Sequence, residues 1–128
     1  MLVSQDNREL LVKQIKETRE LNLEIPIIVE GRLDVVALRK IGFSGEIIHL
    51  PKNKTIINFS YSLTKYREVI LLMDWDRKGK RLTSILEKYL ITEGIRVNLK
   101  LWKLLNTINS ETSNVEGLPA FMEKIGYL

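Results

Sequence analysis

The feature of this 128-residue sequence that most restricts its fold is an uninterrupted apolar run followed by two acids. The segment 69–73 holds five apolar residues in a row and leads directly into Asp74-Trp75-Asp76. A strand that is apolar on both faces is typical of a parallel sheet, because helices cover such a sheet on both sides. The sequence therefore predicts an α/β protein with acids at the carboxyl end of a central strand, where these sheets bind ligands.

Strand-sized and helix-sized segments alternate along the rest of the chain. A first helix of about four turns is expected to begin in a capping box formed by Asp6 and Glu9. The order predicts a three-layer, Rossmann-like arrangement, with a mostly parallel four-stranded sheet and helices on both faces. The expected strands are 25–29, 46–50, 69–73 and 96–102, and the later expected helices are 33–41, 55–66, 79–92 and 115–125, with a loop at 106–114.

Length and composition are those of one globular domain, with 45% hydrophobic and 28% charged residues. We expect a single domain, 1–128, in which an N-terminal helix (1–22) and a C-terminal loop and helix (103–128) flank a core (25–102). The apolar runs are strand-sized, far below the ~20 residues of a membrane span, and the N-terminus lacks a signal pattern. A cytoplasmic protein without a membrane segment is expected.

The chain contains no cysteine and one histidine. This excludes disulfides, thiolate zinc sites and cysteine nucleophiles, and it leaves oxygen as the ligand atom for any metal. Oxygen ligands favour Mg²⁺, with Mn²⁺ as a second possibility. His49 has no second histidine beside it and is expected to be a core or rim residue.

Acidic residues follow two of the expected strands. Glu30 follows Ile27–Val29, and Asp74 and Asp76 follow the run at 69–73. Right-handed crossovers would bring both strand ends to the same edge of the sheet. Two carboxylates so close together repel each other unless a cation lies between them, which favours a divalent metal. The alternative is that Asp76 caps the helix that begins near Gly79, and the residues alone leave both interpretations open.

The two acidic segments together resemble the Toprim domain shared by topoisomerases and primases. The resemblance rests on Ile-Ile-Val-Glu-Gly-Arg-Leu-Asp at 27–34 and Leu-Leu-Met-Asp-Trp-Asp-Arg-Lys-Gly at 71–79, and it extends over about 25–102. In that family a strand ends in Glu-Gly, an acid follows soon after, and a later strand ends in Asp-x-Asp with a glycine nearby. The matching residues here are Glu30, Gly31, Asp34, Asp74, Asp76 and Gly79.

The resemblance implies a role for each acid. Glu30 would act as general acid or base, with Asp34 as a second catalytic residue, and Asp74, Asp76 and Glu30 would bind Mg²⁺ beside a phosphodiester. The chain has no room for the further domains of a topoisomerase or primase, so it looks like a small stand-alone Toprim protein. Val115-Glu116 is similar to a Val-Glu segment of the compact Toprim ribonuclease that matures ribosomal RNA. Glu116 is either a further acid of the site or a solvated residue at a helix start.

Basic residues surround the acids, and the net charge is +4 with a pI near 9.4. Cations in this position would counter the repulsion between carboxylates and a polyanion, whereas the alternative is an ordinary solvated helix surface. Gly31 has no side chain to obstruct a phosphate that approaches the backbone. The candidate nucleic-acid-binding residues are Gly31, Arg32, Lys52, Lys54, Arg77, Lys78, Lys80 and Arg81.

Two functions remain open at this stage. The first is a Mg²⁺-dependent nuclease or related phosphoryl-transfer enzyme acting on DNA or RNA. The second is a Toprim module that binds nucleic acid or protein without turnover, within an RNA-processing or DNA-repair assembly. A two-component receiver domain ranks well below both, because it expects an acidic pair after the first strand and a single aspartate after the third. A haloacid-dehalogenase-like phosphatase would need its Asp-x-Asp after the first strand.

Overall fold

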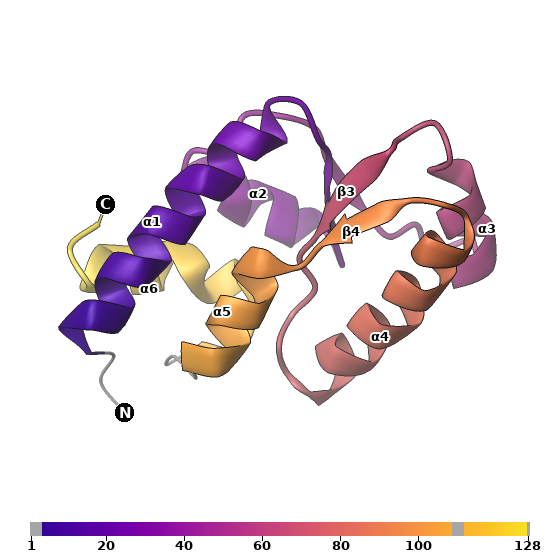
Figure 1. Cartoon of the computed structure of the whole chain (residues 1–128). Coiled ribbons are helices and arrows are strands. Elements are labelled where there is room, and N and C mark those ends of the chain that lie inside the picture. Colours follow the sequence, from indigo (N-terminus) through magenta and orange to yellow (C-terminus); the bar gives the residue numbers. More distant parts are fainter. Residues whose placement is uncertain (1–3, 109–111, 128) are drawn as a thin grey trace.

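The computed structural model describes residues 4–108 and 112–127, in which four parallel strands form one sheet. The strand order is β2-β1-β3-β4, so the two inner strands are β1 and β3. The predicted α/β class and parallel four-stranded sheet are confirmed (Figure 1). The strands are β1 (Ile27–Val29), β2 (Ile47–His49), β3 (Glu68–Leu71) and β4 (Arg96–Asn98).

Helices cover both faces of the sheet because successive strand residues point to opposite sides. In β1, Ile27 and Val29 join the core on one face, and Ile28 joins the core on the other. None of the helices in the described ranges combines the length and apolar character needed to cross a bilayer. The first face carries α1 (Gln5–Asn22), α2 (Arg32–Lys40), α5 (Lys100–Ile108) and α6 (Leu118–Lys124), and the second carries α3 (Ile56–Ser62) and α4 (Arg77–Thr92).

The region after β4 differs most from the prediction. The expected strand 96–102 ends at Asn98, whose side-chain Oδ1 accepts a hydrogen bond from the backbone N–H of Lys100 at 3.0 Å and starts α5. Helix α5 buries Leu101 and Leu105, which are spaced one helical turn apart. The expected C-terminal loop and helix (103–128) therefore begins with helix through Ile108. Residues 109–111 of the expected loop at 106–114 lie outside the described residues.

Two helix starts also differ. Ser4, not Asp6, caps α1: its hydroxyl accepts a hydrogen bond from the backbone N–H of Asn7 at 3.1 Å, so the expected capping box is wrong. The last helix begins with a 3₁₀ turn, η1 (Val115–Gly117), before α6 continues it. This turn lies beside the sheet edge that carries the acids.

Candidate active site

The carboxyl ends of β1 and β3 bring two acids together. The strands are direct neighbours, with Ile28 opposite Leu71. Just beyond them, Oε2 of Glu30 accepts a hydrogen bond from the backbone N–H of Asp74 at 2.8 Å. A side chain from the first strand is thus fixed to the main chain that leaves the third, at the edge expected from the sequence.

Asp34 approaches from the first turn of α2 and is almost buried, with 7% of its surface exposed. Its Oδ2 accepts a hydrogen bond from the backbone N–H of Gly31 at 3.0 Å, which closes the turn between β1 and α2. Burial raises the pKa of Asp34, and the charges of Glu30 and Glu116 raise it further, while the Gly31 N–H acts in the opposite direction. Asp34, Glu30 and Glu116 therefore interact here, and Asp74 is the fourth acid of the group.

The pKa of Asp74 is strongly affected by burial and by these neighbouring acids. Burial, followed by the charges of Glu30 and Asp34 and a hydrogen bond shared with the Glu30 carboxyl, raises the pKa of Asp74 to about 7. The backbone N–H of Val115, which donates to Oδ1 of Asp74 at 3.0 Å, opposes this rise. A cation bound at this place would relieve the repulsion that helps to raise this pKa.

Residues 112–117, which we name the C-terminal strap, are fixed beside Asp74. The backbone N–H of Trp75 donates to the carbonyl of Ser113 at 2.9 Å, and the Trp75 indole N–H donates to the carbonyl of Thr112 at 2.8 Å. Within the strap, Oδ1 of Asn114 accepts from the backbone N–H of Gly117 at 2.8 Å. The strap thereby carries Val115 and Glu116 to the site from a distant part of the sequence.

The acids open into one hollow of about 1270 Å³, which we name the acidic hollow. It also includes His49, which was expected to be a core or rim residue, and Glu116, which was expected to be either a further acid of the site or a solvated residue. Of the predicted basic residues, Arg32, Lys52 and Lys78 line it. The complete lining is Glu30, Gly31, Arg32, Leu33, Asp34, Val36, His49, Leu50, Lys52, Asp74, Lys78 and Glu116.

Asp76 caps a helix and lies outside the acidic hollow. Its Oδ1 accepts a hydrogen bond from the backbone N–H of Gly79 at 2.7 Å and caps α4, the alternative that the sequence left open. Gly79 is needed there, since a Cβ atom would lie 2.0 Å from the carbonyl oxygen of Asp74. Asp76 lines a separate hollow of about 550 Å³ with Arg77, Lys80 and Arg81, while the exposed Lys54 lines neither hollow.

The donor chemistry of the acidic hollow fits a hard divalent cation. Among the described residues, no three acid or histidine side chains converge closely enough to hold an ion by themselves. Mg²⁺ does not require three, since it keeps several waters and is commonly held by one or two carboxylates together with substrate phosphates. Glu30 and Asp74 are the pair that would hold it, because they are adjacent and their repulsion raises the pKa of Asp74.

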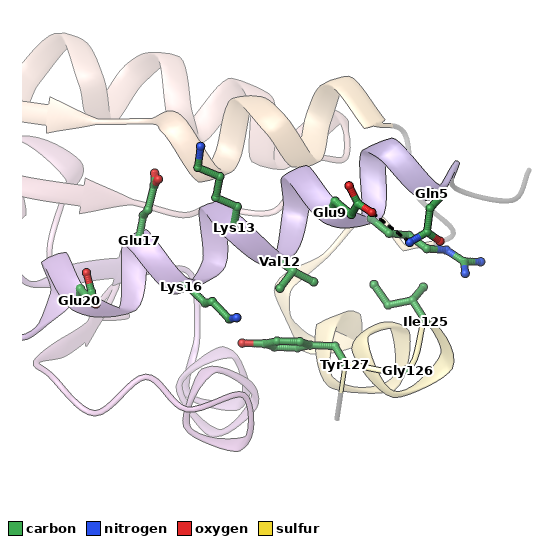
Figure 2. A pocket seen from close by; sticks show the side chains of 11 residues that line it. Gln5, Glu9, Val12, Lys13, Lys16, Glu17, Glu20, Ile125, Gly126 and Tyr127 are labelled. Carbon is green, nitrogen blue, oxygen red and sulfur yellow. Dashed lines mark hydrogen bonds between the residues drawn. The ribbon is translucent and has the colours of Figure 1, made fainter.

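A further hollow of about 600 Å³ lies between α1 and the residues that follow α6 (Figure 2). Figure 2 shows the Tyr127 ring reaching toward Lys16 of α1, with Val12 and Ile125 close to it. The lining carries charges of both signs and none of the acids of the acidic hollow. It is a separate feature of the surface.

Comparison with known proteins gives consistent results. The Toprim domain family model matches residues 25–102, which include Glu30 and Asp74 but end before the strap. A UPF0292 protein of Thermoplasma volcanium is 42% identical over 111 residues, 86% of this chain and 92% of that protein. A UPF0292 protein of Methanocaldococcus jannaschii is 34% identical over 91% of this chain and 92% of its own length. A solved structure of a protein from Aquifex aeolicus has a TM-score of 0.72 at 30% identity, over 83% of this chain and 95% of that one.

Proposed function

The chain belongs to the Toprim domain family and to the UPF0292 proteins, and from that membership we propose that it is a Mg²⁺-dependent enzyme that cleaves or transfers phosphodiester bonds in nucleic acid. Toprim domains in general bind metal and associate with nucleic acid. The observation that supports the finer proposal is the 2.8 Å contact between the Glu30 carboxylate and the backbone N–H of Asp74, which keeps two acidic residues together in a hollow that is also lined by cations.

In this proposal each acidic residue at or near the acidic hollow has its own role. Mg²⁺, when bound, supplies positive charge that stabilises the phosphoryl oxygens. Asp74 and Glu30 hold the ion, and Glu30 also moves a proton to or from the reacting oxygen as general acid or base. Asp34 keeps the turn at Gly31 in place through their 3.0 Å contact. Asp76 supports the site as the cap of α4, and any contact with the metal would use its remaining oxygen.

Cations lie on the rim of the same hollow, where a substrate backbone would pass. Arg32, Lys52 and Lys78 are exposed, and none of them forms an ion pair with another described residue. They would bind phosphates on either side of the scissile bond, and such contacts weaken as salt concentration rises.

Cleavage of single-stranded, double-stranded and structured RNA and DNA by the purified chain tests the proposal. We expect cleavage in Mg²⁺ or Mn²⁺ that EDTA stops, and a loss of roughly 100-fold or more in Asp74→Asn and Glu30→Gln, the contribution typical of such groups. Both replacements preserve size and can still accept the hydrogen bonds from Val115 and Asp74. Glu24→Gln, an exposed acid after α1, is the matched control and should retain full activity.

The competing function is a binding module in an RNA-processing or DNA-repair assembly. It is favoured by one observation, the engagement of Asp76 as a helix cap outside the acidic hollow. If the chain shifts the mobility of nucleic acid but cleaves no substrate in any divalent metal, the binding module is correct and the enzyme proposal fails.

A further inference from the structure

One wall of the acidic hollow is apolar. Leu33 and Val36 line it from α2 with 61% and 46% of their surfaces exposed. They are three positions apart on the helix and so lie next to each other. Leu50 and the exposed His49, at the end of β2, line the same hollow. Large apolar side chains left in water beside a charged site have a free-energy cost that a ligand could recover by covering them.

Charge decides on which side of this wall a polyanion would lie. On the side of the acidic hollow the wall is accompanied by Arg32, Lys52 and Lys78. On its other side lies a smaller hollow of about 450 Å³, which Leu33 and Val36 also line and which holds Lys40 with the acids Glu116 and Glu123. The acidic hollow therefore offers a phosphate three cations next to the acids that would hold the metal, whereas the smaller hollow offers one cation and has no such acid pair.

We propose that Leu33 and Val36 form a subsite for an unstacked nucleobase, so that the substrate is a single strand or a nucleotide displaced from a duplex. This inference rests on the proposed function of the acidic hollow. A duplex presents its phosphates and sugars outward and keeps the faces of its bases stacked, so it offers the apolar wall little to bury. An unstacked base exposes an apolar face that can cover the wall while its neighbouring phosphates contact the cations.

Binding to defined oligonucleotides tests the subsite. The full chain is titrated, in EDTA so that no strand is cut, into three fluorescent probes: oligothymidylate or oligouridylate, a duplex of equal length, and an abasic strand with the same backbone. We expect the single strand to bind most tightly. Leu33→Ser and Val36→Ser should each weaken that binding by roughly fivefold, as expected for losing part of a buried aliphatic side chain, and leave the abasic strand unaffected.

Ile91→Ser is the matched control, because Ile91 is 57% exposed on α4 and does not line the acidic hollow. It should bind all three probes as the wild type does. Because both wall residues are exposed, their serine variants should fold like the wild type, and circular dichroism is used to check this.

Two results overturn the subsite. One is equal affinity of the wild type for all three probes. The other is wild-type affinity in both wall variants, which is also the outcome if a protein partner covers the wall. Neither result bears on metal-dependent cleavage by the wild type or its loss in Asp74→Asn, so failure of the subsite is distinguishable from failure of the proposed function.

Discussion

Asp74 is the residue through which the parts of the candidate site are connected. Its backbone N–H holds Glu30, its Oδ1 is held by Val115, and its carbonyl oxygen accepts the indole N–H of Trp102 at 3.1 Å. The residue thus joins β1, β3, α5 and the strap, and its carboxyl group cannot turn away from the acids that raise its pKa. The crowding has a measurable effect on stability.

The stability of the metal-free protein should fall as the pH rises from about 4 to about 7 because of Asp74. The pKa of Asp74 is about 7 in the folded chain and 3.8 ordinarily. Between these values the folded state keeps a proton that the unfolded state releases, so the stabilisation is present at low pH and lost as pH passes 7. We expect a loss of about 1–2 kcal/mol for this half-buried, solvent-screened group.

Denaturant unfolding of the wild type and Asp74→Asn in EDTA measures this effect. The free energy of unfolding of the wild type should decline relative to that of the variant across this pH range, and added Mg²⁺ should offset the decline at pH 7. If the difference in unfolding free energy between the wild type and Asp74→Asn stays constant with pH, the raised pKa of Asp74 is contradicted.

At the scale of elements, the sequence predicted the central strands better than the chain's last third. The run at 25–29 contains β1 and the run at 69–73 overlaps β3, because an unbroken apolar run is typical of a strand inside a covered sheet. The residues 96–102 alternate like a strand, but Leu101 and Leu105 repeat at helical spacing, and packing against α1 selects the helix after Asn98. The sequence pattern alone could not decide between the alternation typical of a strand and the spacing typical of a helix.

The same limit applies to the candidate site. Glu30 and Asp74 could be predicted to meet because parallel topology fixes where strand ends lie. Val115-Glu116 was singled out only through a resemblance, and its contact with Asp74 could not be predicted because it runs through the backbone N–H of Val115, which carries no sequence signal. Asp76 shows the converse: the sequence allowed its side chain two roles, and the structure shows the helix cap through the Gly79 N–H, while a role in metal binding stays a prediction.

The strap should contribute to metal affinity through its rigidity. Asn114→Ala removes the side chain that accepts the Gly117 N–H, which should cost about 1 kcal/mol of stability, as for a helix cap. Because Val115 then holds Asp74 less firmly, Mg²⁺ affinity should fall by roughly tenfold, the size of effect seen when the support of a metal ligand is lost.

Calorimetric titration with Mg²⁺ measures this, and Asn98→Ala provides the control. The Oδ1 atom of Asn98 likewise accepts a hydrogen bond from a backbone N–H at a helix start, that of Lys100 in α5 at 3.0 Å, but Asn98 does not line the acidic hollow. Both variants should lose similar stability, and only Asn114→Ala should lose metal affinity. Equal Mg²⁺ affinity in the two variants would exclude the strap from this role.

At the scale of the whole molecule, one face of the sheet depends on residues outside the Toprim match. The core of that face draws on Leu11 and Ile15 of α1, Leu105 of α5 and Leu118 and Met122 at the C-terminal end. All of them lie outside residues 25–102. Without them, much of the apolar cover on this side of β1 and β3 would be lost and α2 would remain as its main helix.

We therefore expect a fragment restricted to residues 25–102 to lack a stable fold. Burying an aliphatic side chain contributes about 1.5–3 kcal/mol, so the loss of the five side chains named above is comparable to the 5–15 kcal/mol by which domains are usually stable. Thermal unfolding followed by circular dichroism should show a cooperative transition for the full chain and none for the fragment. A cooperative transition in the fragment would mean that the flanking helices are dispensable for folding.

Both tryptophans of the chain have their indole N–H groups engaged around Asp74, Trp75 with Thr112 and Trp102 with Asp74 itself. The indole ring is the dominant natural fluorophore of a protein, so the intrinsic emission of this chain originates almost entirely at the candidate site. Arrival of an ion or a nucleotide there can be followed without any attached dye, and each single Trp→Phe replacement would tell which side of Asp74 reports it.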